Sequence, residues 1–155
     1  MTNMSDLYDT DVFQWADHQA VLLRRRAAGE LVNEAELDWP NIAEEIESLG
    51  KIQSRELSSR IATIILHLMK LQASPADAPR GGWRDTILEQ RDEIERLLAD
   101  APSLRARIPD TIASEMDRAK RRSRAALAGY GERPDHDLDA IVYTTDQVLG
   151  SWLPA

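Results

Sequence analysis

Apolar residues recur at intervals of three and four along most of the chain, which is the spacing of one face of an α-helix. This pattern predicts four main helices, over about residues 9–28, 38–73, 83–99 and 104–130, and a short C-terminal helix over 146–149. Glycine, proline and polar residues gather between these segments, which is typical of short connections. We therefore expect an all-α fold, an antiparallel four-helix-bundle-like domain. One helical domain should cover residues 1–155, with a loose terminus over 1–7.

The helix predicted over 38–73 is the longest, and we expect the other helices to pack around it. Asp38 is a favourable N-cap, and Pro40 suits a first turn because its missing N–H needs no partner there. An apolar stripe keeps one helical phase along the segment: Ile42, Ile46, Leu49, Leu57, Ile61, Ile64, Leu68 and Leu71. This phase favours a continuous helix with Gly50 at a close crossing or a slight bend, and two helices that break at Gly50 are the alternative. Between 61 and 71 apolar residues lie on every side, which indicates burial on every side.

The composition excludes several kinds of site. The 155 residues include no cysteine, so the chain has no disulfide, thiolate zinc site or thiol nucleophile. Its net charge of -8 argues against general binding to a nucleic-acid backbone. The longest apolar run, 61–71, is shorter than the roughly 20 residues of a membrane span. With no signal peptide evident, we expect a soluble, cytoplasmic protein that does not bind membranes.

Several landmarks follow one another in a characteristic order. They are YDTDVFQWADHQAVLLR over 8–24, LDWPNIAEEIESLG over 37–50, SRELSSRIATIILHLMKLQ over 54–72, WRDTILEQRDEI over 83–94, APSLRARI over 101–108 and YTTDQVLGSWLP over 143–154. This order resembles the bacterial and cyanobacterial family catalogued as domain of unknown function twenty-nine, and AEEIESLG and HLMK are its most specific parts. Gly82 stands where a serine usually precedes the tryptophan, and 33–36 looks like a small insertion. The resemblance implies an all-helical bacterial protein and brings no assigned activity and no catalytic residues.

Two pairs of carboxylates are candidates for a metal site. Glu44 and Glu47 are one helical turn apart, and Glu89 and Asp92 repeat that spacing on the third predicted helix. On facing antiparallel helices these pairs, with Glu45 beside them, could hold Mg²⁺ or Mn²⁺ through carboxylate oxygens. The arrangement resembles the two-part acidic motif of MazG-type all-alpha nucleotide pyrophosphohydrolases, which implies a divalent-cation-dependent nucleotide hydrolase. The alternative is a solvated helix N-terminus, where the helix dipole favours acidic residues.

The second candidate is a polar seam along one edge of the apolar stripe. Its members are Glu45, Glu56, Arg60, Thr63, His67 and Lys70. Apolar surroundings should keep His67 neutral, so that it can act as a base or a metal ligand. Alternatively, the histidine is hydrogen-bonded within the core and the Glu56–Arg60 pair fixes the packing register. Several ionisable groups converge here beside the predicted core, so this seam is our candidate catalytic site.

A third candidate is the basic run of Arg118, Lys120, Arg121, Arg122 and Arg124. These residues span all faces of a helix, and no aromatic residues stand among them to stack on bases. We therefore favour pairing with acidic surface, within this protein or on a partner, over binding to nucleic acid.

Association is the leading functional hypothesis. We expect a helical-bundle protein that acts through a homodimer or another protein partner, with the long helix as its contact surface. The alternatives are the Mg²⁺- or Mn²⁺-dependent nucleotide hydrolase described above and, more weakly, nucleic-acid binding through residues 118–124. We predict no cofactor outside the hydrolase alternative, and the sequence leaves open whether the protein is an enzyme.

Overall fold

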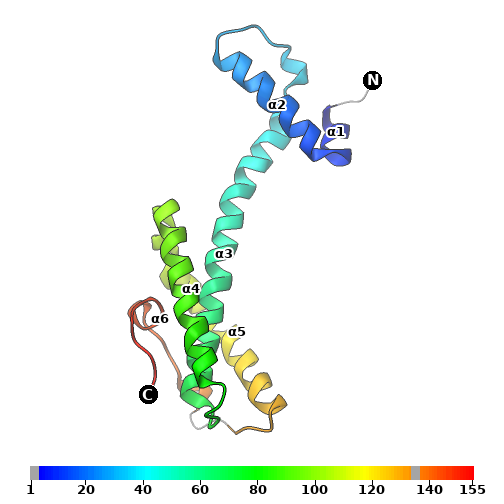
Figure 1. Ribbon diagram of the computed structural model, residues 1–155. Helices are drawn as coiled ribbons and strands as arrows, with labels where there is room; N and C mark the ends of the chain where they lie inside the picture. The colour runs from blue at the N-terminus through cyan, green and yellow to red at the C-terminus, as the bar shows by residue number, and fades with distance from the viewer. Residues whose placement is uncertain (1–3, 134–136) are drawn as a thin grey trace. The chain divides into compact units, whose positions relative to one another are not determined.

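A computed structural model describes residues 4–133 and 137–155 of the chain (Figure 1). These residues form six α-helices and three short 3₁₀-helices and contain no strand, which confirms the predicted all-α class. The elements are α1 (Met4–Thr10), α2 (Val12–Ala27), η1 (Glu34–Glu36), α3 (Trp39–Ala73), α4 (Arg80–Asp100), η2 (Pro102–Arg107), α5 (Ile108–Gly129), η3 (Leu138–Ala140) and α6 (Thr145–Leu149). The long central helix and the short C-terminal helix are therefore confirmed. No helix in this part of the chain has the length and hydrophobicity that crossing a membrane requires.

The contacts of the chain gather into two compact units, where the sequence predicted one domain over 1–155. Unit 1 is Met1–Lys51 and unit 2 is Ile52–Ala155, so the boundary falls inside α3. The physical reason lies in α3 itself, because no residue between Ile42 and Leu57 is buried. The apolar stripe continues through this interval, but Ile46 and Leu49 are 65% and 66% exposed.

Unit 1 is built around a small apolar core of Trp15, Leu22, Leu37 and Ile42. Buried polar groups join its elements. The Trp15 indole N–H donates to Asp38 Oδ2 at 3.1 Å, and the Gln19 side chain donates to the Glu36 carbonyl and accepts from the Asp38 N–H. Asp38 lies just before α3, and its carboxylate accepts from the side chains of Trp15 and Asn41.

The first predicted helix, over 9–28, is two helices. Asp11 separates α1 from α2 because its carboxylate accepts the Gln14 N–H and caps the new helix, as short acidic side chains commonly do. The expected loose terminus over 1–7 is wrong for residues 4–7, which belong to α1. Residues 1–3 lie outside the described part of the chain.

Unit 2 holds the larger core. In Figure 1, α4 and α5 lie alongside the second half of α3. Between Ile61 and Leu71 every large apolar residue of α3 is buried, which confirms the prediction from the all-round apolar pattern. Pro109 lies in the first turn of α5, where the preceding 3₁₀-helix η2 ends. Thr144 and Gln147 form a capping box at the start of α6.

Helix α3 runs unbroken through Gly50, so the favoured continuous helix is confirmed. The expected close crossing at this glycine is wrong. A Cβ placed on Gly50 meets no atom of the described residues within 4 Å. The glycine is therefore not needed to admit a neighbouring element.

Candidate functional site

The structure divides the predicted polar seam between the two units. Glu45 belongs to unit 1, whereas Glu56, Arg60, His67 and Lys70 belong to unit 2. In unit 1, Glu45 Oε1 accepts a hydrogen bond from the Tyr8 hydroxyl at 2.6 Å. This bond, with the burial and negative charge around it, raises the pKa of Tyr8 to about 12. Glu45 therefore joins α1 to α3 within unit 1.

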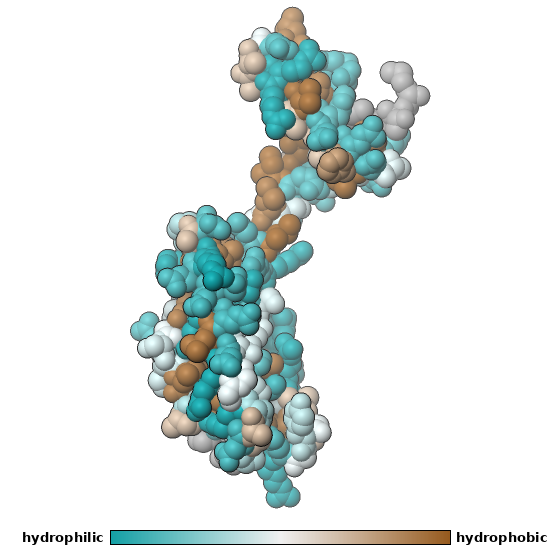
Figure 2. Space-filling model, viewed as in Figure 1, coloured by the Kyte–Doolittle hydropathy of each residue, from teal (hydrophilic) through white to brown (hydrophobic). Residues whose placement is uncertain are grey.

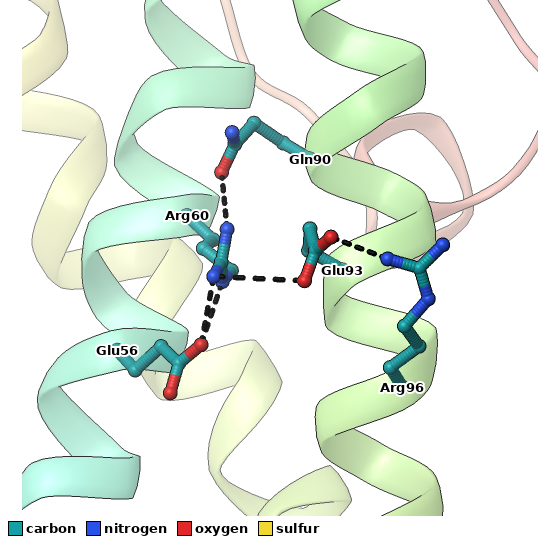
Figure 3. A network of polar contacts seen from close by, with 5 residues as sticks. All are labelled: Glu56, Arg60, Gln90, Glu93 and Arg96. Atoms are coloured by element: carbon teal, nitrogen blue, oxygen red, sulfur yellow. Dashed lines mark hydrogen bonds and ion pairs between the residues drawn. The ribbon is translucent and has the colours of Figure 1, made fainter.

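Arg60 is the centre of a polar network between α3 and α4 (Figure 3). Its Nε and Nη2 donate to Glu56 Oε1 at 3.0 and 2.8 Å, and its Nη1 donates to Gln90 Oε1 at 3.1 Å. Glu93 Oε2 lies 3.8 Å from Arg60 Nη2, and Glu93 also pairs with Arg96. The guanidinium thus meets two carboxylates and one amide. Most of its donors are used, so the geometry supports the structural alternative, in which the Glu56–Arg60 pair fixes packing.

His67 is a neutral histidine with a defined tautomer. Its Nδ1 lies 2.8 Å from the Thr63 carbonyl oxygen, and because a carbonyl can only accept, Nδ1 carries the proton. Burial lowers the pKa of His67, and the positive charges of Lys70 and Arg122 lower it further, while the bond to Thr63 acts in the opposite direction. The lone pair therefore resides on Nε2 near neutral pH. No carboxylate orients this ring among the described residues, so His67 lacks the partner that commonly activates a catalytic histidine.

Lys70 belongs to the same cationic neighbourhood. Burial lowers the pKa of its ammonium, and the charge of Arg122 adds to this effect. The ammonium lies 5.8 Å from the centroid of the Trp83 ring on α4, a cation–π distance. His67, Lys70 and Arg122 therefore form a group in which positive charges outnumber negative ones.

The two acidic pairs belong to different units. Glu44 and Glu47 are exposed residues of unit 1, and Glu47 lies 3.8 Å from Lys51. Glu89 and Asp92 are exposed residues of unit 2. Across residues 4–133 and 137–155, no three or more His, Asp or Glu side chains gather in a way that could hold a metal ion. The metal site stays a prediction, which a thermal-shift titration with Mg²⁺ or Mn²⁺ and a nucleotide panel would test.

Three of the five cations in the basic run pair with acidic residues or backbone of the same chain. Arg118 pairs with Glu115, Arg124 pairs with Asp139, and Lys120 donates to the Asp139 carbonyl oxygen at 2.9 Å. Arg118 and Arg124 thus pair with acidic residues within the protein, as expected, whereas Lys120 binds backbone. Arg121 and Arg122 form no ion pair with any other described residue.

Sequence reasoning missed Arg91, which is only 8% exposed. Its Nε donates to the Val148 carbonyl at 2.9 Å, and its Nη2 donates to the carbonyls of Gln147 and Trp152, both at 2.8 Å. Burial lowers the pKa of this guanidinium. The signal was present, because Arg91 stands in the inward row with Ile87, Ile94 and Leu98 at helical spacing. An arginine in such a row indicates a buried partner, here the backbone around α6.

Comparison with known proteins identifies the family. No curated protein and no solved structure matches the chain. The sequence model of one family, described as Domain of unknown function DUF29, matches residues 7–153. This range covers nearly the whole chain and all of the landmarks that carried the resemblance, apart from Pro154 at the end of the last one. The chain therefore belongs to the DUF29 family.

Proposed function

We propose that this protein acts through association, and that a second copy binds at the N-terminal part of α3. The observation that supports this proposal is the exposure of three large apolar residues there. Trp39, Ile46 and Leu49 are 47%, 65% and 66% exposed. The space-filling view in Figure 2 shows apolar surface on this part of α3. Solvent-exposed apolar residues at helical spacing are what a docking helix covers.

The spacing places these side chains on one face. Trp39, Ile42, Ile46 and Leu49 follow one another at intervals of three, four and three, the pattern of a helix–helix seam. Ile42 is buried in the core of unit 1, and the later residues continue the row beyond that core. A second helix laid along this row would bury Ile46 and Leu49, each worth about 1.5–3 kcal/mol when fully covered.

The small core of unit 1 favours association, because it buries little apolar surface by itself. Among the described residues, only four apolar side chains are buried in its core cluster, and an isolated domain of about 60 residues is marginal in stability. A second copy would extend the apolar surface that this unit covers.

The charges near this face permit a second copy as the occupant. The whole chain carries a net charge of -8, so most pairings of two copies would bring like charges together. The face that contains Ile46 and Leu49 also carries Ala43 and Gly50, none of which is charged. Two copies can meet there without repulsion between the contacting side chains.

Sedimentation equilibrium of the full chain over a range of concentrations tests the proposal. We expect the mass to rise from one copy to two, and the double variant Ile46→Lys with Leu49→Lys to stay at one copy. Leu31→Lys is the matched control, because Leu31 is 97% exposed on the connector between α2 and η1. Far-UV circular dichroism checks that each variant keeps its helices. A wild-type chain that stays at one copy, or a control that loses association equally, contradicts the proposal.

A further inference from the structure

A groove in unit 2 lies between two helices that the candidate sites above did not connect. It has a volume of about 460 Å³ and is lined by residues of α3 and α5. This volume lies within the range of small-molecule sites in proteins, roughly 300–1,000 Å³. The residues that line it are of few kinds, chiefly serine and arginine.

The α3 wall offers hydroxyl groups that the protein does not use. Ser54 and Ser58 stand one turn apart and are followed at the same spacing by Ala62, so small side chains keep the groove open. Ser59 lies beside this row, and the hydroxyls of the three serines form no hydrogen bond with any described residue. By contrast, the Thr63 hydroxyl is bonded to the Ser59 carbonyl at 3.0 Å. Three hydroxyl donors thus remain available to a ligand.

The α5 wall brings guanidinium groups to the same groove. Glu115, Arg118 and Arg122 follow at intervals of three and four, so they share one face of α5. Glu115 is only 7% exposed, and Arg118 Nη1 lies 3.3 and 3.2 Å from its two carboxylate oxygens. The buried carboxylate is therefore neutralised by Arg118. Arg122, and Arg55 from α3, form no ion pair with a described residue.

The groove therefore has a surplus of positive charge in an acidic protein. Three arginines line it against a single carboxylate that is already paired. Arg122 also lies close enough to His67 and Lys70 for its charge to act on both groups. Guanidinium and hydroxyl donors on two facing walls suit a tetrahedral oxyanion, whose oxygens accept hydrogen bonds from several directions.

We propose that the groove between α3 and α5 binds the phosphate group of a small-molecule ligand, held by Arg55, Arg122 and the serine hydroxyls. This site is independent of the association surface, because all its residues belong to unit 2 and the association residues belong to unit 1.

Titration of the full chain with inorganic phosphate at constant ionic strength tests the proposal. Isothermal calorimetry gives the affinity, and backbone amide NMR shifts locate the site. We expect saturable binding, with the largest shifts at residues 54–63 and 115–122. Arg122→Gln should weaken binding about tenfold or more, because it removes a charge-assisted donor, whereas Arg121→Gln should change it less than about twofold. Arg121 is the matched control, since it is the adjacent exposed arginine of α5 and does not line the groove.

Two further variants separate geometry from net charge. Arg55→Gln removes the second unpaired guanidinium and should weaken binding as Arg122→Gln does. Ser58→Leu fills the groove without a change in charge and should also abolish saturable binding, provided that circular dichroism shows an intact fold. A short single-stranded oligonucleotide serves as the competing ligand class.

Three results would overturn the proposal. The first is phosphate binding that does not saturate. The second is an equal loss of affinity in Arg121→Gln and Arg122→Gln, which indicates general charge attraction. The third is tight binding of the oligonucleotide by a chain that does not bind phosphate, which indicates a nucleic-acid surface.

Discussion

Replacement of Arg91 by methionine should destabilise unit 2 more than the same replacement of any exposed arginine. Arg91 reaches from α4 to three backbone carbonyls, those of Gln147, Val148 and Trp152. It thus links α4 to the backbone of α6 and of the residues that follow α6. Methionine keeps much of the arginine stem and removes the donors, so the effect reports the hydrogen bonds more than the packing.

The expected loss in the free energy of unfolding is the difference between the hydrogen bonds of Arg91 and the cost of burying its charge. Each hydrogen bond from a charged donor contributes roughly 1.5–3 kcal/mol, so three bonds give about 4.5–9 kcal/mol. Burial of the guanidinium costs several kcal/mol, since the charge leaves water and has no carboxylate partner. Its Nη1 is also buried without a partner among the described residues, which adds to that cost. The substitution also leaves three carbonyls without a donor, and we expect a net loss of about 2–4 kcal/mol.

Urea unfolding followed by circular dichroism measures this loss. Arg96→Met is the matched control on the same helix, because Arg96 has a 70% exposed side chain and its ion-pair partner among the described residues is Glu93. Exposed ion pairs contribute about 0–1 kcal/mol, so the control should change little. Arg91→Lys should restore only part of the stability, since one ammonium cannot match the planar fork of the guanidinium. Amide hydrogen exchange should show the loss of protection concentrated around Val148.

Two results would refute parts of the reasoning about Arg91. If Arg91→Met costs no more than Arg96→Met, the three carbonyl bonds only offset the burial of the charge. If Arg91→Lys is as stable as wild type, the charge matters and the fork geometry does not.

Three further predictions concern single residues. Gly50→Ala should raise the free energy of unfolding by about 0.5–1 kcal/mol in a urea titration, because α3 is helical there and the new methyl group meets no atom. The pKa of His67 should lie below the ordinary histidine value of about 6.5 in an NMR pH series. As the pH falls below about 6.5, the unfolded chain binds a proton at this histidine before the folded chain does, so the free energy of unfolding should decrease. His67→Gln should remove this part of the pH dependence of stability. Glu45→Gln should lower the pKa of Tyr8 from about 12, seen as an earlier phenolate absorbance change, and an unchanged titration would contradict the role given to the Tyr8–Glu45 bond.

Helical phase predicted the positions of most elements and the inward rows of unit 2, because those rows consist of apolar residues that the core covers. It failed where a single polar side chain competes with the helix. Asp11 caps α2 and separates it from α1. In the sequence this residue lies within a segment of unbroken helical spacing, so the spacing does not reveal the break. Helical phase also does not show whether another element packs on a given row of apolar residues. Ile46 and Leu49 keep the phase of the buried stripe, yet they remain exposed because no described element packs on them.

The residues of the predicted polar seam lie in two units, and helical phase could not show this either. Glu45 lies on the same edge of the helix as Glu56 and Arg60, but its partner is the Tyr8 hydroxyl within unit 1, whereas Arg60 binds residues of α4 in unit 2. A wheel diagram assigns residues to an edge and says nothing about which neighbour each edge meets. The α5 wall of the groove is hard to recognise in the sequence, because its residues stand within a run of charges that spans all faces of the helix. The three-and-four spacing of Glu115, Arg118 and Arg122 indicates one shared face.

One row of α3 unites these results. From Trp39 it proceeds at alternating intervals of three and four through Ile42, Ile46, Leu49, Gln53, Glu56, Arg60, Thr63, His67 and Lys70. The row is apolar as far as Leu49 and polar from Gln53 onward. In unit 2 the polar part of the row includes Arg60, which meets Gln90 and Glu93 on α4. In unit 1 the apolar part runs past the core and remains exposed at Ile46 and Leu49. These exposed apolar residues at helical spacing are the feature on which the proposed contact with a second copy rests.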